Sequence, residues 1–450
     1  MDTKDLMISV SGVRGVVGKS ATPEVFTRFA AAYGMLIGPH KVMVGMDTRQ
    51  SGDMIKHAVH AGLISVGCQP MEIGICPTPT IGLMVRTLSA RGGVAITASH
   101  NPAEWNAVKF FRDNGLLLNE SWGEELLRIF HGDEIKRSEW QDLKPVEVVE
   151  GAILTHLSRI MGYLDASLVW GKRFKVALDC CNGAGSLIGP QLLQQMGCEP
   201  VLLNVDANGK FPHDPEPVAE NLQQLSQAVR SSGADVGFAQ DADVDRIGLV
   251  DETGRVLGEE YTLALAIQYV LSKTKGPVVT NLSTSRAIED IAKAYGCELV
   301  RTKVGEVNVA ERMVALGSPI GGEGNGGVIL PEITPGRDAT AAMGLILECM
   351  AASGRRLSEL ADALPKYAIV KKKYPCPREA VDEMLQVVRK TFSGGSMDET
   401  QGIRIDWDDA WLHIRPSGTE PVVRVIAEAR EEDRAEKLCD RGRRIIQEFV

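Results

Sequence analysis

Three aspartates at alternate positions, Asp241, Asp243 and Asp245, suggest a metal site. Carboxylates this close repel one another, and burying them together is costly without a cation. Such oxygen ligands suit Mg²⁺, which often completes its shell with a phosphate oxygen. A calcium loop is the alternative, because Glu252 is its twelfth residue counted from Asp241. That loop needs glycine where Arg246 stands and flanking helices where this chain has apolar strands, so we favour Mg²⁺ over calcium or a solvated turn.

Ser99 is a second candidate for chemistry. It ends a run of small and β-branched residues, and the following His100, Asn101 and Pro102 predict a sharp turn that makes the serine prominent. A free hydroxyl is a poor nucleophile, and Ala98 replaces the glycine of a hydrolase-type elbow. We therefore favour a serine that carries phosphate beside Mg²⁺ and the aspartates over a hydrolase-type catalytic triad, because its charges are better balanced. A purely structural turn is the alternative. The cations that could balance its charge are Arg14, Lys109 and Arg246.

Two further loops could bind a substrate. The segment Arg415–Pro421 combines an arginine, two hydroxyls and a glycine, and Arg424 follows it, so it could wrap a phosphate or form only a tight turn. The segment Glu323–Gly327 joins an acidic acceptor and an amide on a glycine-rich backbone, which would suit sugar hydroxyls. It lacks the glycine spacing of a dinucleotide site.

An internal repeat predicts how these loops are positioned. A β-rich run, a helix-like stretch and a Gly-Cys step into a second apolar run occur three times. The first runs are Lys41–Asp47, Lys175–Asp179 and Pro277–Asn281, and the Gly-Cys steps begin at Gly67, Gly197 and Gly296. Each unit then forms a third strand that ends in the serine, aspartate or Glu323 loop. The sequence therefore predicts three similar α/β/α domains whose loops face one central cleft; three unrelated surface loops are the alternative.

The last segment differs and reads as a small α+β domain. Helix-like patterns cover Glu379–Phe392 and the stretch from Glu431 onward, with strands between them around 402–427. Its loop is the one that begins at Arg415. We expect domain boundaries that divide the chain into residues 1–150, 151–255, 256–365 and 366–450.

Composition excludes several classes of protein. The net charge of −10 argues against nucleic-acid binding. No apolar run is long enough to span a membrane, and the N-terminus lacks a signal-peptide pattern. Nine scattered cysteines without a Cys-x-x-Cys pair favour a reduced, cytoplasmic protein without structural zinc.

The four loops together resemble the α-D-phosphohexomutase superfamily, in order and one per domain. An N-terminal loop, Ser11–Gly15, is also similar to that family's Gly-x-Arg-Gly loop. The resemblance implies a phosphoserine at Ser99, bound to Mg²⁺ with Asp241, Asp243 and Asp245. It also implies a hexose 1,6-bisphosphate that forms from a hexose phosphate and turns over in the cleft.

The resemblance implies roles for the remaining residues. Arg14, His100 and Lys109 would serve catalysis, with Lys109 as general acid or base. Substrate would be bound by Arg246, Lys303, Glu323, Asn325, Arg415, Ser417, Gly418, Thr419 and Arg424.

The preferred hexose is less strongly indicated. Gly327 stands where many relatives have histidine, Ala107 replaces a usual glycine, and with the segment Lys303–Glu306 these features resemble the phosphoglucosamine mutase branch. Phosphomannomutase or phosphoglucomutase activity is the main alternative. A metal-dependent sugar phosphatase and a non-catalytic sugar-phosphate sensor are further ones, and we expect a monomer or a homodimer.

Overall fold

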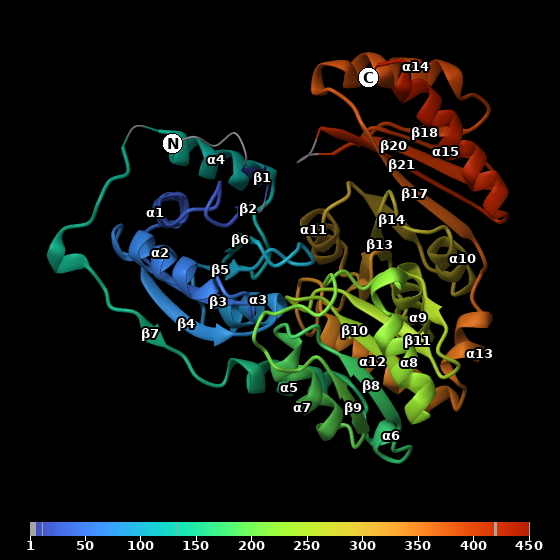
Figure 1. The fold of residues 1–450 in the computed structure, drawn as a ribbon, viewed down its shortest axis with the longest axis horizontal. Coiled ribbons are helices and arrows are strands. Elements are labelled where there is room, and N and C mark those ends of the chain that lie inside the picture. The colour runs from blue at the N-terminus through green and yellow to red at the C-terminus, as the bar shows by residue number, and fades with distance from the viewer. Residues whose placement is uncertain (1–5, 11, 133, 418–420, 450) are drawn as a thin grey trace.

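The computed structural model describes residues 6–10, 12–132, 134–417 and 421–449, which fold around four β-sheets (Figure 1). The sheets follow one another along the chain. The predicted α/β class, with three α/β/α domains and a C-terminal α+β domain, is confirmed. Among the described residues, no helix is long and apolar enough to cross a membrane. All nine cysteines are free thiols.

The first sheet has seven strands in the order β1-β2-β6-β5-β3-β4-β7. Its strands are β1 (Met7–Ser9), β2 (Gly12–Val16), β3 (Lys41–Met46), β4 (Gln69–Ile75), β5 (Gly92–Ile96), β6 (Trp105–Arg112) and β7 (Glu147–Val148). Its helices are α1 (Pro23–Ile37), α2 (Gly52–Ile64), α3 (Thr78–Thr87) and α4 (Glu120–His131). Val42 and Val44 pack toward α1, α2 and α4, whereas Met43 packs toward α3. The central strand is thus buried on both faces, which explains its unbroken apolar run.

The second sheet has the order β12-β11-β10-β8-β9. Its strands are β8 (Lys175–Asp179), β9 (Glu199–Leu203), β10 (Val236–Gln240), β11 (Ile247–Asp251) and β12 (Val256–Leu257). Its helices are α5 (Ala152–Tyr163), α6 (Ala166–Trp170), α7 (Gly185–Gln195), the 3₁₀ helix η2 (Ala219–Asn221) and α8 (Gln223–Ser232). Because β12 pairs with β11, this sheet extends just past the boundary expected at residue 255.

The third sheet has the order β14-β13-β15-β16. Its strands are β13 (Val278–Asn281), β14 (Leu299–Thr302), β15 (Ile320–Glu323) and β16 (Gly327–Ile329). Its helices are α9 (Glu259–Lys273), α10 (Ala287–Ala294), α11 (Glu306–Leu316), α12 (Ala339–Ser353) and α13 (Leu357–Asp362). Side chains of α9 and α12 join those of β8, β10 and α7 in one hydrophobic cluster, so the second and third units share a core.

The C-terminal sheet is antiparallel, in the order β17-β21-β20-β19-β18. Its strands are β17 (Ala368–Pro375), β18 (Ser396–Asp398), β19 (Ile403–Asp406), β20 (Ala410–Pro416) and β21 (Val422–Ala429). The 3₁₀ helix η3 (Arg378–Ala380), α14 (Val381–Thr391) and α15 (Glu432–Gln447) accompany it. Both α-helices pack on one face and form a core of their own.

The threefold repeat is visible in the strand order. In each of the first three sheets, the first strand of the unit lies between parallel neighbours, the second and third strands. The third strand is followed by an antiparallel partner, which is β6, β11 or β16. The predicted βαβ units are therefore confirmed, and each predicted loop is the turn between the third strand and this antiparallel partner.

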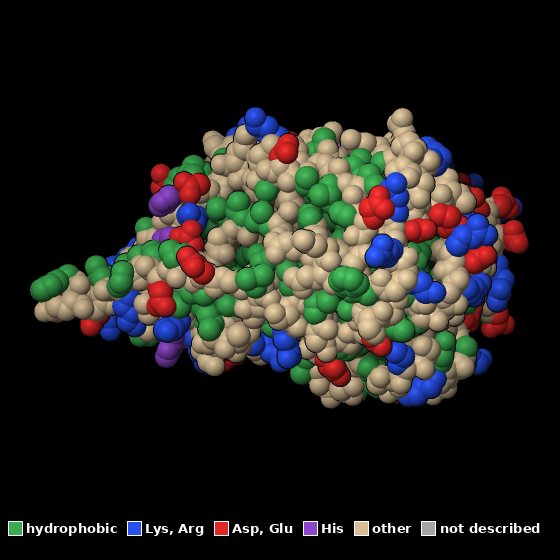
Figure 2. Space-filling view, turned by 90° about the horizontal axis from the view of Figure 1, so that it is seen from below, with side chains coloured by type: hydrophobic (Ala, Val, Ile, Leu, Met, Phe, Trp, Pro, Cys, Tyr) green, Lys and Arg blue, Asp and Glu red, His purple; other side chains and the backbone are tan. Residues whose placement is uncertain are grey.

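The segment between α4 and β7 projects at one end of the molecule (Figure 1). It contains the 3₁₀ helix η1 (Trp140–Asp142), and Trp140 is 78% exposed. Figure 2 shows hydrophobic side chains on this narrow end, while charged side chains gather at the opposite end. The projection lies at the far end of the first domain from the serine and aspartate loops.

Candidate active site

The serine loop is held in a strained, buried conformation. Ser99 has φ +51°, a left-handed value that is uncommon for a residue other than glycine. Its main-chain N–H donates to Thr97 Oγ1 (2.9 Å), and Thr97 donates in turn to Asp47 (2.7 Å). Backbone strain of this kind persists only where surrounding contacts enforce it, and it is concentrated at functional sites.

Arg49 supplies the strongest of these enforcing contacts and was missed by the sequence analysis. Its guanidinium is buried, pairs with Asp47 and donates to main-chain carbonyls around the serine. The acceptors are the carbonyls of Ser99 (2.7 Å), Asn101 (2.6 Å), Pro102 (2.6 Å) and Trp105 (3.0 Å). One side chain therefore fixes the whole turn, and the Asp47-Thr48-Arg49 sequence directly after β3 was the available signal.

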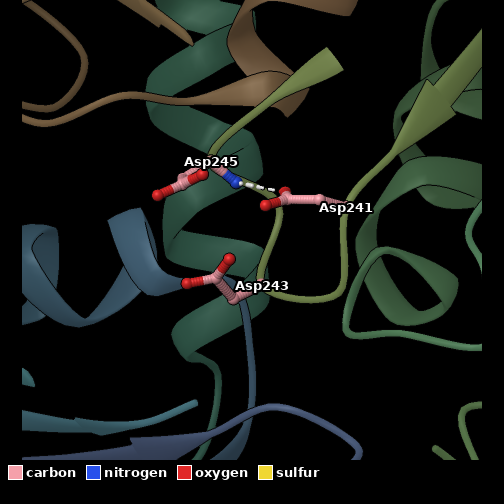
Figure 3. Close-up of side chains that lie close together, drawn as sticks. All are labelled: Asp241, Asp243 and Asp245. Atoms are coloured by element: carbon pink, nitrogen blue, oxygen red, sulfur yellow. Dashed lines mark hydrogen bonds between the residues drawn. The ribbon is translucent and has the colours of Figure 1, made fainter. Parts of the chain in front are cut away.

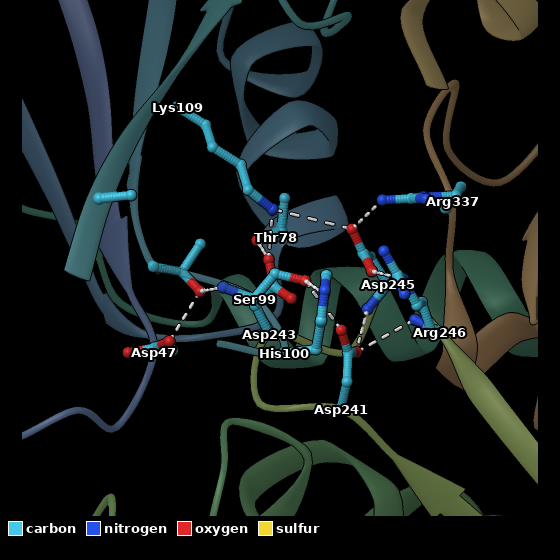
Figure 4. Close-up of polar contacts among 12 residues, drawn as sticks. Asp47, Thr78, Ser99, His100, Lys109, Asp241, Asp243, Asp245, Arg246 and Arg337 are labelled. Carbon is cyan, nitrogen blue, oxygen red and sulfur yellow. Dashed lines mark hydrogen bonds and ion pairs between the residues drawn. The ribbon is translucent and has the colours of Figure 1, made fainter. Parts of the chain in front are cut away.

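The serine loop meets the aspartate loop of the second domain. Ser99 Oγ donates to Asp241 Oδ2 over 3.1 Å, and His100 Nδ1 lies 3.3 Å from the same Oγ (Figure 4). Arg14 donates to Asn101 Oδ1 over 3.1 Å, which places the N-terminal loop against the serine turn. Four residues predicted to act together, Ser99, His100, Arg14 and Asp241, are thus brought together.

The aspartate loop points its carboxylates toward a common centre (Figure 3). Asp241, Asp243 and Asp245 are all buried, and one oxygen from each lies within 4.8 Å of the others. Val244 between them has φ +63°, a strained value for a β-branched residue. The antiparallel strands β10 and β11 flank the loop, so the calcium-binding helix–loop–helix alternative is excluded.

Several donors bind the cluster but leave two oxygens open. Asp241 Oδ1 accepts from the main-chain N–H groups of Asp245 (3.0 Å) and Arg246 (3.1 Å). Asp243 Oδ2 accepts from Lys109 Nζ and from Thr78 Oγ1, each over 2.7 Å. Asp243 Oδ1 and Asp245 Oδ1 are buried without a hydrogen-bond partner, and the second lies 3.8 Å from Arg246 Nε. Unpartnered buried carboxylate oxygens are costly, so the donor set fits a bound cation.

Burial and neighbouring charges shift the pKa values in opposite directions across the cluster. Burial, reinforced by Asp245 and Asp243, raises the pKa of Asp241 well above its usual range. Burial also acts on Asp245, but Arg337, Lys109 and Arg246 outweigh it and lower the pKa of that carboxyl. Asp241 therefore resists ionisation unless more positive charge is supplied.

The pKa values of two basic groups near the serine, His100 and Lys109, are also shifted. Arg246 and burial lower the pKa of His100 to about 2, so its imidazole is neutral. Burial opposes the charge of Lys109, but Asp243 and Asp245 overcome it and raise the pKa of the ammonium. Arg246 lies 3.2 Å from Glu216, a loop residue of the second domain that sequence reasoning missed, and His100 Nε2 is 3.8 Å from the same carboxylate. A neutral imidazole and a charged ammonium therefore flank the serine.

Arg337 connects the aspartate loop to the third domain and was also missed. It is buried and pairs with Asp245 (2.5 Å), Glu323 (2.8 Å) and Glu306 (3.4 Å). Burial disfavours its charge, yet these carboxylates raise its pKa further above its usual range. Its position after Pro335-Gly336 gave only the signal of a turn.

The loop Glu323–Gly327 of the third domain, which we call the sugar loop after its predicted role, lies at this junction. Glu323 accepts from Arg337, from Asn281 Nδ2 (2.7 Å) and from the N–H of Gly305 (3.0 Å), so much of its hydrogen-bonding capacity is used within the protein. Asn325 is half-buried and accepts from the Gly327 N–H over 3.3 Å. Lys303 is exposed and lies 3.7 Å from Glu120 at the start of α4.

A cavity of about 750 Å³ brings the substrate-binding candidates together. Its walls include Lys109, Arg246, Lys303, Glu323, Asn325, Arg337, Arg415 and Arg424. A smaller pocket of about 180 Å³ around Ser99 shares Lys109, Arg246 and Arg337 with it. The serine therefore opens into a cleft formed by the first three domains and the C-terminal domain. Gly418 and Thr419 lie outside the described residues. Of the substrate-binding candidates in the C-terminal domain, Arg415 and Arg424 line the cavity.

Arg415 and Arg424 form an unusual cross-strand pair. They lie directly opposite each other on β20 and β21. Burial and the Arg424 charge lower the pKa of Arg415 to about 10. Arg415 Nε is buried without a hydrogen-bond partner. Like charges opposite each other destabilise a sheet, so the pair fits a site for an anion, and Ser417 follows Arg415 on the same loop.

Family models match almost the whole chain. The models of the phosphoglucomutase/phosphomannomutase family match residues 6–136 (α/β/α domain I), 154–254 (domain II), 259–367 (domain III) and 368–445 (C-terminal domain). The boundaries expected at 150/151, 255/256 and 365/366 stay a prediction, because a match does not fix the residue at which a domain ends.

Curated relatives match over nearly the full length. A protein of Thermococcus kodakarensis named "Phosphoglucomutase/phosphomannomutase" is 38% identical and covers 98% of both chains. A protein of Methanopyrus kandleri named "Probable phosphoglucosamine mutase" is also 38% identical, over 98% of this chain and 97% of its own.

Solved structures share the fold. A phosphoglucomutase/phosphomannomutase family protein from Burkholderia thailandensis has a TM-score of 0.87 at 24% identity, covering 98% of this chain and 97% of its own. An Aspergillus fumigatus N-acetylphosphoglucosamine mutase, solved in complex with GlcNAc-6P and magnesium, has a TM-score of 0.62 at 17% identity, covering 99% and 96%.

Three α/β/α domains and a C-terminal α+β domain place a serine beside an aspartate triad and open it into a cleft with paired arginines, as in an enzyme that acts on small phosphorylated molecules. The chain belongs to the phosphoglucomutase/phosphomannomutase family of the α-D-phosphohexomutase superfamily. Its reaction class is that of a phosphohexomutase, an isomerase that moves a phosphoryl group within a sugar phosphate.

Proposed function

We propose that this phosphohexomutase interconverts glucosamine 6-phosphate and glucosamine 1-phosphate, with a phosphoserine at Ser99 and a hexose 1,6-bisphosphate intermediate. The observation that carries the proposal is the 3.1 Å contact of Ser99 Oγ with Asp241, beside two unpartnered aspartate oxygens in a cleft lined by basic side chains. Phosphoryl transfer depends mainly on positioning and on neutralising charge, and this arrangement offers both.

Mg²⁺ fits the aspartate loop. Asp241, Asp243, Asp245 and Ser99 would hold it, because the two open oxygens are hard ligands of the kind this ion prefers. When bound, the ion neutralises negative charge on the phosphoryl group that is transferred.

The groups around the serine would accept the proton and stabilise negative charge during the transfer. In the forward reaction, the sugar O1 hydroxyl attacks the phosphorus on Ser99, a bond from O1 to phosphorus forms and the bond from phosphorus to Oγ breaks. The hydroxyl proton must leave the sugar. Lys109 was predicted from the sequence to take this role, but the raised pKa of Lys109 keeps it an ammonium that can only donate. The neutral imidazole of His100, adjacent to Ser99 Oγ, is an available acceptor, although with its pKa lowered to about 2 it is a weak base. The charged Lys109 ammonium and the Arg246 guanidinium stabilise negative charge on the transferring oxygens.

The far end of the cleft would hold the other phosphate. Arg415 and Arg424 repel each other across two strands, and a phosphate dianion between them would relieve that repulsion. Ser417, Gly418 and Thr419 would complete the cradle. Glu323, Asn325 and Lys303 would contact the sugar between the two sites. After the first transfer, the bisphosphate turns over in the cleft and returns its O6 phosphoryl group to Ser99.

The choice of glucosamine phosphate is supported by two observations. Several relatives over the full length are named as phosphoglucosamine mutases, and Gly327 removes the side chain that many family members place beside the sugar. Mannose and glucose phosphates are the alternatives, as the Thermococcus kodakarensis relative suggests by its name. A cytoplasmic location and a monomeric or homodimeric state stay predictions.

A coupled assay with the purified chain, Mg²⁺ and a trace of hexose 1,6-bisphosphate tests the proposal. We expect kcat/KM for glucosamine 6-phosphate to exceed the values for mannose 1-phosphate and glucose 1-phosphate. A preference for either of the latter would overturn the substrate while preserving the reaction. Release of inorganic phosphate in place of isomerisation would overturn the mutase and support a phosphatase.

A further inference from the structure

A second cavity lies behind the sugar loop, where the second, third and C-terminal domains meet. It has a volume of about 300 Å³, within the range of small-molecule sites. Its walls are mainly apolar and include Pro217, Leu257, Ala264, Leu364, Tyr367 and Ile369. None of the residues to which we assign a role in phosphoryl transfer lines it. The cavity is therefore separate from the catalytic cleft.

The polar groups of this cavity carry an excess of negative charge. Glu259, Glu260 and Glu428 contribute carboxylates, and Lys371 of β17 contributes the single ammonium among the charged residues that line it. Lys371 Nζ pairs with Glu259 Oε2 (3.0 Å) and lies 3.4 Å from Glu260 Oε1. Lys371 is thus shared between Glu259 and Glu260, and the lining holds more carboxyl groups than ammonium groups.

Two carboxylate oxygens at the cavity are buried without a hydrogen-bond partner. Glu428 is 1% exposed; its Oε1 accepts from Trp411 Nε1 and from the Arg286 N–H, each over 2.8 Å, while its Oε2 has no partner. Glu260 Oε2 accepts from the Ser285 N–H over 3.1 Å, while its Oε1 makes no hydrogen bond. Burial raises the pKa of Glu260 to about 7, although the Lys371 ammonium opposes this shift. Lys371 Nζ forms an ion pair with Glu260 Oε1, whereas Glu428 Oε2 is an orphaned acceptor, which points to a donor that the protein itself does not supply.

From the cavity, its apolar walls and the unpartnered Glu428 Oε2, we infer a binding site for a small organic cation, an apolar body that bears one ammonium group. The apolar body would fill the volume between Leu257, Leu364 and Ile369. The ammonium group would donate to Glu428 Oε2 and share Glu260 with Lys371, with the short, charge-assisted hydrogen bonds that such pairs form.

A cation bound at this site would affect the backbone of the sugar loop, because the residues that bind it also contact that loop. Lys371 Nζ also donates to the Gly324 carbonyl (3.3 Å), and the Glu260 carboxylate packs so closely on Gly324 that a Cβ there would collide with it. Gly324 lies between Glu323 and Asn325, the residues proposed to contact the sugar. The cation would thus share its carboxylate partner with the backbone that shapes the substrate loop.

The test uses the full chain with excess Mg²⁺, so that the aspartate loop does not compete for the probe. Benzylammonium is the probe, and benzyl alcohol is its neutral counterpart of similar shape. Binding is measured by calorimetry and by ligand-observed NMR. We expect benzylammonium to bind and benzyl alcohol to bind at least about tenfold more weakly, because it cannot form the charge-assisted bonds. No binding of benzylammonium at millimolar concentration, or equal binding of the two probes, would overturn the site.

Variants of similar shape test whether benzylammonium binds in this cavity. Glu428→Gln keeps the acceptor for Trp411 and removes the charge, and we expect at least about a tenfold loss of benzylammonium affinity. Glu260→Gln gives an independent second variant with the same expected loss. Glu436→Gln is the matched control. Glu436 lies on α15, pairs with Lys372 of β17 and does not line the cavity. Unchanged affinity in both pocket variants, with circular dichroism showing that they are folded, would contradict the assignment.

Discussion

Ser99 Oγ lies 3.1 Å from Asp241 Oδ2, although the two residues are 142 positions apart in the sequence. The contact joins two domains through their equivalent loops, each placed where a third strand turns into an antiparallel partner. In the proposed mechanism, a repeated fold thus supplies the phosphoryl carrier from one copy and metal ligands from the next.

Ser99→Ala should nearly abolish turnover, because Ser99 Oγ, which lies 3.1 Å from Asp241, is the proposed carrier of the phosphoryl group. We expect kcat to fall by at least about 10³-fold with the fold intact. Labelled hexose 1,6-bisphosphate should leave phosphate on the wild-type protein and none on the variant. Ser121→Ala, on the exposed start of α4, is the control and should keep full activity. Substantial activity in the Ser99 variant would refute the phosphoserine role.

Asp243→Asn should weaken Mg²⁺ binding by at least about tenfold, since it removes charge from an oxygen pair that has one open position. Thr78→Val should have a smaller effect in the same direction, because the Thr78 hydroxyl only orients the carboxylate, over 2.7 Å. Titration with Mg²⁺, or with Mn²⁺ followed by electron paramagnetic resonance, measures both. Asp433→Asn on the exposed face of α15 is the control. An unchanged metal affinity in the Asp243 variant would exclude the loop as the metal site.

Arg415→Ala should mainly raise KM. Loss of charge-assisted bonds to a phosphate corresponds to about a 10- to 100-fold weaker binding. Steady-state kinetics with glucosamine 6-phosphate measures the change, and inorganic phosphate should inhibit the variant less than the wild type. Arg389→Ala is the matched control in the same domain, because Arg389 pairs with Glu399 on the surface. An unaltered KM would remove Arg415 from the phosphate site.

Much of this architecture could be predicted from the sequence, because the patterns involved are local. Apolar strands followed by polar loops predicted the βαβ units, and the alternating aspartates predicted a metal site before any geometry was known. Arg337 could not be predicted, because its role depends on carboxylates from the second and third domains meeting around it. The shared core of those two domains was missed for the same reason. Repetition in sequence suggested independent units, whereas α9 and α12 bury side chains against both sheets.

Arg49→Lys should lower kcat by about 10²-fold while leaving KM close to the wild-type value. A lysine ammonium cannot reach the four carbonyls that the guanidinium fork holds, so the Ser99 turn would relax and the nucleophile would be misplaced. Arg28→Lys is the matched control, since Arg28 also donates to main-chain carbonyls of the first domain, at Phe130 and Gly132. A loss of thermal stability equal in the two variants, without a selective fall in kcat for Arg49→Lys, would show a purely structural role.

His213→Gln should destabilise the protein in acid and have little effect in base. His213 Nε2 lies 3.0 Å from Asp179 Oδ2, and this partner, against the opposing effect of burial, raises the pKa of the imidazole above its ordinary value of 6.5. A group whose pKa is raised on folding stabilises the protein below its unfolded pKa. That stabilisation is lost as the pH rises through the folded pKa.

Thermal unfolding of wild type and variant at about pH 5.5 and about pH 8.5 measures the effect, with the larger difference in Tm expected at the lower pH. His57→Gln is the control, because His57 is exposed on α2 and its nearest carboxylate oxygen, of Asp53, is 3.7 Å away. A difference that grows toward pH 8.5 would mean that the neutral imidazole, not the imidazolium, holds the loop after β9 against Asp179.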